Sequence, residues 1–98
     1  MPSAEYVEAK LQSDLEKGLL FALEGTVQRV NYPRRELTVI AGGEVWRFRL
    51  APDCQLWFDD RQAILRCFHP LDRARIIFAR TPQGNEIRAM YAWERQPA

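Results

Sequence analysis

The chain has 98 residues and a mass of 11.5 kDa, enough for one domain with a buried core and too little for two ordinary domains. Its hydrophobic fraction of 47% and charged fraction of 28% are typical of a globular protein and exclude a disordered chain. No run of about 18 apolar residues is present, which excludes a membrane-spanning helix. We expect a single domain over residues 1–98 and no membrane partner.

The small net charge of +1 conceals an uneven distribution along the chain. Residues 1–24 carry two lysines and five acidic residues, whereas residues 25–98 carry twelve arginines, no lysine and eight acidic residues. A guanidinium presents a planar fork of donors that suits phosphate, carboxylate and aromatic faces. The arginines therefore indicate a binding surface, or else they reflect only a GC-rich genome.

The first predicted element is an α-helix over residues 3–17. Ser3 is a suitable N-cap, and Gly18 is a suitable residue to follow the last turn. Val7, Leu11 and Leu15 recur at every fourth position and form an apolar stripe. We favour the interpretation that this stripe caps one open end of the chain's own barrel. The alternative is self-association or pairing with a protein partner.

Period-two patterns then predict three strands. The first covers residues 19–30 and bends near Gly25, where a bulge or a close backbone approach suits a barrel. The second covers residues 36–41 and leads through a two-glycine hairpin turn into the third, over residues 44–50. Residues 51–53 are expected to close the third strand.

The second half of the chain predicts two further strands. A short apolar piece over residues 54–58 ends at Asp59 and Asp60, and residues 63–68 indicate a helical turn. Strands are expected over residues 73–80 and 86–93, and the tail over residues 94–98 should fray. We therefore predict an all-β fold with one N-terminal α-helix. The barrel over residues 19–93 is a small five-stranded OB-like barrel with a short helical turn before its fourth strand.

Four segments carry a resemblance to a known group of folds. The segments that begin at Gly25, Arg35, Val45 and Ala63 resemble the strands and turns of small bacterial OB-like barrel domains of unknown function, over about residues 23–93. More distantly they resemble the periplasmic copper-efflux chaperones, which are similar in strand order. The resemblance implies a small barrel and says little about its ligand.

The copper site of those chaperones, which uses His and Met with a Trp nearby, does not carry over to this sequence. Met1 and Met90 are the only methionines, and His69 lies in a predicted turn rather than on a strand. Trp46 alone does not make a metal site. We expect no metal and no cofactor.

The predicted ligand face of the barrel is formed by its second and third strands and the loops beside them. Thr38, Ile40, Arg47 and Arg49 belong to that face by alternation, and Gln83 lies in a flanking loop. The candidate binding residues of the face and its loops are Tyr32, Arg34, Arg35, Arg47, Arg49 and Arg80.

The predicted function is that of a non-catalytic binding or adaptor module that uses this arginine-rich face. The alternative is single-stranded DNA or RNA binding on the same face, because arginines beside an aromatic ring serve both phosphates and bases. An enzyme is not expected. His69 is the only imidazole, and adjacent carboxylates such as Asp59 and Asp60 are far more often solvated than paired for acid–base chemistry.

The two cysteines, Cys54 and Cys67, belong to no metal-binding motif, and we expect them to be free and buried rather than joined by a disulfide. The N-terminus lacks a basic segment followed by an apolar one, so we expect a cytoplasmic protein. A mature exported form remains the alternative.

Overall fold

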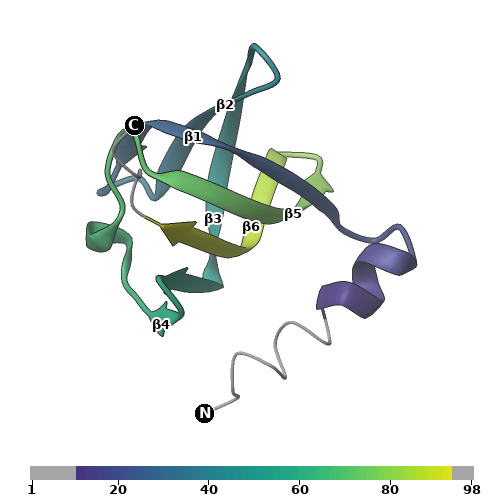
Figure 1. Cartoon of the computed structure of the whole chain (residues 1–98). Helices are drawn as coiled ribbons and strands as arrows, with labels where there is room; N and C mark the ends of the chain where they lie inside the picture. The colour runs from purple at the N-terminus through teal and green to yellow at the C-terminus, as the bar shows by residue number, and fades with distance from the viewer. Residues whose placement is uncertain (1–10, 94–98) are drawn as a thin grey trace.

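The structure is a computed structural model that describes residues 11–93. The strands are β1 (Phe21–Asn31), β2 (Glu36–Ala41), β3 (Glu44–Phe58), β4 (Arg61–Gln62), β5 (Arg73–Thr81) and β6 (Gly84–Trp93), as Figure 1 shows. A 3-10 turn, η1 (Leu65–Cys67), precedes β5, and residues 11–16 are α-helical. The start of the predicted helix and the tail expected to fray lie outside the described residues.

Five of the strands close into a barrel. β1 pairs antiparallel with β2 and β5, β2 pairs antiparallel with β3, and β5 pairs antiparallel with β6. The parallel pair of β3 and β6 completes the ring, while the two-residue β4 pairs only with the end of β3. The predicted all-β class, the closed five-stranded barrel, the helix near the N-terminus and the helical turn before the fourth barrel strand are confirmed.

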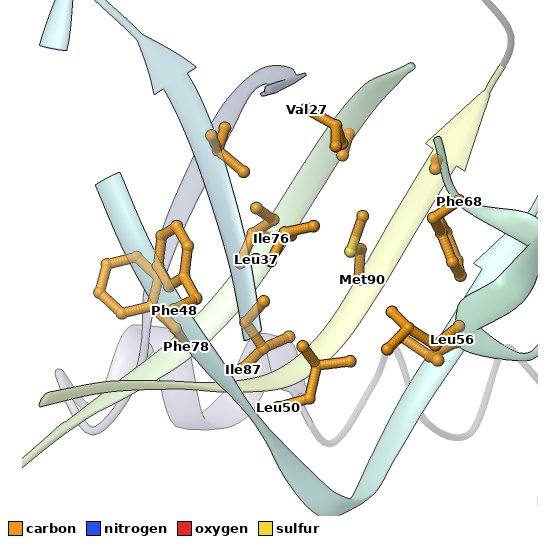
Figure 2. Close-up of a cluster of buried hydrophobic side chains, with 14 residues drawn as sticks. Val27, Leu37, Phe48, Leu50, Leu56, Phe68, Ile76, Phe78, Ile87 and Met90 are labelled. Atoms are coloured by element: carbon orange, nitrogen blue, oxygen red, sulfur yellow. The ribbon is translucent and has the colours of Figure 1, made fainter. Parts of the chain in front are cut away.

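Alternate residues of each strand fill the barrel interior. Figure 2 shows this cluster, in which Phe48 and Phe78 lie at one end and Phe68 at the other. Phe48 and Leu50 are buried while Arg47 between them is exposed, as the alternation predicts. Trp46 is only half-buried and stacks on Phe48, with ring centroids 6.4 Å apart.

The third strand is longer than predicted. β3 runs through residues 51–53, which were expected to close it, and ends at Phe58. Its pairing with β6 is interrupted between Leu50 and Gln55, and Figure 2 shows β3 turning sharply between Leu50 and Leu56. Pro52 lies in this interruption, so its missing N–H costs the sheet no hydrogen bond.

Gly25 allows β1 and β2 to cross closely. A Cβ at this position would lie 2.5 Å from the carbonyl oxygen of Ile40 and 2.7 Å from Cγ1 of Val39. The close approach predicted at Gly25 is thus confirmed. The bulge lies three residues later, where the register of β1 against β2 shifts between Val27 and Arg29.

The helix near the N-terminus ends where predicted. Gly18 has a φ of 74°, and the N–H of Leu19 donates to the carbonyl of Asp14 at 3.0 Å, as in a Schellman cap. Leu11 and Leu15 of the apolar stripe are half-buried, and Val7 lies outside the described residues. Among residues 11–93, no helix is long and apolar enough to cross a membrane.

Candidate functional site

Three residues form a row across the outside of the barrel. Arg29 of β1 is opposite Thr38 of β2, and Thr38 is opposite Arg47 of β3. Both arginines are exposed, and their backbones are about 10 Å apart, since neighbouring strands are spaced by about 4.8 Å. We call Arg29, Thr38 and Arg47 the arginine row.

The arginine row borders a hollow of about 330 Å³ on the outer face of β1, β2 and β3. Asn31 and Glu36, at the two ends of the loop that joins β1 to β2, line the same hollow. The complete lining is Gln28, Arg29, Asn31, Glu36, Leu37, Thr38, Val45, Arg47 and Phe48.

The arginines on this side of the barrel differ in whether they are neutralised. Within residues 11–93, neither Arg29 nor Arg47 forms an ion pair. Arg49 donates to Glu86 at 3.1 Å, and the same carboxylate also accepts from Arg88 at 3.0 Å. Both guanidiniums of the arginine row are therefore without a carboxylate partner among the described residues, whereas the predicted binding residue Arg49 is engaged with Glu86 of β6.

The predicted loop residues mostly hold the barrel together. The hydroxyl of Tyr32 donates to the carbonyl of Phe68 at 2.7 Å, and the guanidinium of Arg35 donates to the carbonyl of Ala51 at 3.3 Å. Arg34 is exposed, and its backbone N–H donates to Oδ1 of Asn31 at 3.1 Å. Tyr32 and Arg35 line a separate hollow of about 350 Å³ with Pro33, Ile64, Leu65 and Arg66.

Arg80 does not join this group. Its guanidinium lies 4.5 Å from the centroid of the Phe21 ring, a cation–π contact between β5 and the start of β1. Arg80 is absent from the lining of the hollow beside the arginine row. The structure therefore brings together Arg47 with Arg29 and Thr38, and separates them from Arg80.

Sequence reasoning missed Arg29 and Gln28. Strict alternation from the buried Val27 turns Arg29 inward, but the bulge lets both Gln28 and Arg29 face outward. The sequence did carry a signal of this bulge: two polar residues stand between Val27 and Val30, which is the pattern of one extra residue in a strand.

The side chains that resemble copper ligands are dispersed. Met90 is fully buried in the barrel interior, while His69 is exposed on the loop before β5. Residues 11–93 contain no group of three or more His, Cys, Asp or Glu side chains placed to hold a metal ion. The described residues thus do not fit a copper site of the His and Met type.

The two cysteines are free and have different environments. Burial raises the pKa of the Cys54 thiol to about 12, and the nearby Arg35 opposes part of that shift. Cys67 is exposed, which corrects the expectation that both thiols are buried.

Solved structures of CusF from Escherichia coli are similar to this chain in fold. The silver-bound protein matches with a TM-score of 0.61 at 10% identity, covering 74% of this chain and 90% of CusF. The apo protein matches with a TM-score of 0.59 at 11% identity, covering 74% of this chain and 86% of CusF. The predicted resemblance to the copper-efflux chaperone barrels is confirmed at the level of the fold. No family model and no curated protein matches the chain.

Proposed function

We propose that this chain is a small non-catalytic binding module that holds an anionic ligand on the outer face of β1, β2 and β3. The observation that carries the proposal is the arginine row, in which two exposed guanidiniums without a carboxylate partner among the described residues flank Thr38. Guanidinium N–H groups match phosphate and carboxylate oxygens, and the Thr38 hydroxyl adds a further donor.

The chemistry of the hollow supports binding rather than catalysis. Glu36 is the only acidic side chain in its lining, and no histidine or cysteine of the described chain lines it. A general base needs a neighbouring nucleophile or a substrate proton within hydrogen-bond reach. CusF, with which this chain shares its fold, was solved with bound silver, so a barrel of this form serves as a binding scaffold in that protein.

Single-stranded nucleic acid is the second candidate ligand. Support comes from the loop between β1 and β2: its two ends, Asn31 and Glu36, line the hollow, and the loop itself carries Arg34 and Tyr32. Arginines for phosphates and one ring for stacking are the components of such a site. Tyr32 is 37% exposed, so its ring is the aromatic group proposed to stack on a base.

The test is a fluorescence-anisotropy titration of the full chain with a labelled oligothymidylate and, separately, a labelled oligoglutamate peptide. Binding of either probe at low salt, weakened by the double substitution Arg29→Gln with Arg47→Gln, supports the module. Arg61→Gln with Arg75→Gln is the matched control, since it removes equal charge from exposed positions that line neither the hollow of the arginine row nor that of Tyr32. If neither probe binds, or if both double variants weaken binding equally, the proposal is wrong.

The nucleic-acid candidate predicts a specific salt dependence. Each single-strand phosphate contact contributes about 0.7 to the slope of log affinity against log salt, so losing Arg29 and Arg47 should lower that slope by about 1.4. Oligothymidylate binding with that change favours nucleic acid. Tighter binding of oligoglutamate favours a protein ligand.

A further inference from the structure

A second hollow lies on the outer face of the barrel, on strands β3, β6 and β5, which run side by side. It has a volume of about 290 Å³. Trp57 is opposite Tyr91, and Tyr91 is opposite Arg75, so these residues form a row across the three strands. Their neighbours Leu56 and Met90 are in the interior cluster, so the row faces outward.

The turn between β3 and β4 contributes two carboxylates to the same hollow. Asp59 and Asp60 have φ values of 48° and 65°, in the left-handed region that aspartate tolerates better than most residues. The N–H of Asp59 donates to the carbonyl of Ala92 at 3.0 Å, which fixes the turn beside Trp93. The lining is Trp57, Asp59, Asp60, Arg75, Tyr91, Ala92 and Trp93.

Opposite charges share this hollow without neutralising one another. Within residues 11–93, no ion pair involves Arg75, Asp59 or Asp60. Trp57 is only 9% exposed, and its indole N–H is buried without a hydrogen-bond partner. Unpaired buried donors are uncommon in folded proteins, and this one belongs to a side chain that lines the hollow.

We propose that this hollow binds a small zwitterion, with its ammonium group toward the two aspartates and the aromatic rings and its carboxylate toward Arg75. Carboxylates and the faces of Trp and Tyr both attract an ammonium group, and methylated ammonium groups suit aromatic walls especially well. A guanidinium is the usual partner of a carboxylate. The volume is at the lower limit for ligand pockets, so the ligand is a small molecule.

A ligand of one sign fits the hollow less well. A simple organic cation leaves Arg75 beside it with like charge, and a simple anion meets Asp59 and Asp60. This site shares no residue with the arginine row, so the two proposals stand or fall separately.

The test is a titration of the full chain followed by tryptophan fluorescence and amide chemical shifts. Glycine betaine is the zwitterionic probe, choline carries the same trimethylammonium group without a carboxylate, and glucose is a neutral probe. We expect glycine betaine to bind more tightly than choline, and glucose not to bind.

Substitutions assign the two ends of the ligand. Arg75→Gln should weaken glycine betaine about tenfold and leave choline unchanged or tighter, which also shows that the variant is folded. Asp60→Asn, which keeps a residue that tolerates the left-handed region, should weaken both probes. Arg66→Gln, outside this hollow, is the control and should change neither affinity.

Three binding results would overturn the zwitterion site, and a fourth result concerns the chemical shifts. The binding results are the absence of glycine betaine binding, choline binding as tight as that of glycine betaine with no effect of Arg75→Gln, and binding of glucose in place of both. Shifts confined to residues away from Trp57 and Tyr91 would also contradict it.

Discussion

Single residues set the closest contacts of this barrel, and Gly25 is the clearest case. The position lies against the backbone of β2, which cannot move away without breaking its pairing with both β1 and β3. Gly25→Ala should therefore destabilise the fold by about 1–3 kcal/mol, the usual cost of overpacking, as measured by chemical denaturation.

Gly42→Asn is the control for that substitution. A Cβ at Gly42 meets nothing within 4 Å, and asparagine tolerates its φ of 60°. The control should change the free energy of unfolding only slightly. An equal loss of stability in both variants would contradict the close approach at Gly25.

The two cysteines predict a contrast in reactivity at the residue scale. At neutral pH, a thiol with a pKa of about 12 is almost wholly protonated, so Cys54 should react slowly with iodoacetamide in the folded chain. The exposed Cys67 should react first, and denaturant should expose Cys54. Peptide mapping after timed alkylation measures both rates, and fast labelling of Cys54 without denaturant would contradict its burial.

At the scale of elements, one hydrogen bond connects two loops. The hydroxyl of Tyr32 joins the turn after β1 to Phe68, which follows η1 and is fully buried. Tyr32→Phe removes the donor and should lower the free energy of unfolding by about 1 kcal/mol. Thermal or chemical denaturation measures this loss. A stability equal to that of the parent chain would show that the bond contributes nothing.

Local sequence patterns predicted those elements whose limits are set locally. The strand at 36–41 and the turn at Gly42 and Gly43 were predicted as observed, because alternation and a two-glycine turn define a hairpin by themselves. The extension of β3 beyond Pro52 was not predicted, because it depends on parallel pairing with β6, some 35 residues later. Long-range pairing of this kind leaves no mark in a short window of sequence.

The candidate site was predicted in part for the same reason. Arg47 was correctly assigned to the outer face, whereas Arg29 reached that face only through the bulge. Arg49 and Tyr32 stay predicted binding residues, and the structure adds partners that were not foreseen: Arg49 pairs with Glu86, and the Tyr32 hydroxyl donates to the carbonyl of Phe68. Such partners are set by tertiary packing, which alternation alone does not reveal.

At the scale of the whole molecule, the N-terminal apolar stripe has two predicted roles, a cap of its own barrel or a surface that pairs with a partner. Leu11 and Leu15 are half-buried but are not among the hydrophobic side chains packed against the interior cluster, so the helix as a cap of its own barrel stays a prediction. A chain that begins at Gly18 should then unfold more readily than the full chain. Circular dichroism and sedimentation measure stability and mass for both. A truncated chain that stays folded, with a full chain that self-associates, would favour the partner-binding alternative.

The binding proposal also belongs to the whole molecule, because the arginine row exists only once β1, β2 and β3 have closed side by side. Its most direct test is an amide chemical-shift map of the full chain during titration with oligothymidylate and with oligoglutamate. We predict that the shifts caused by at least one probe centre on Gln28, Arg29, Thr38 and Arg47, and that they vanish in the Arg29→Gln, Arg47→Gln double variant. Shifts centred elsewhere on the barrel, or none with either probe, would contradict the proposed binding face.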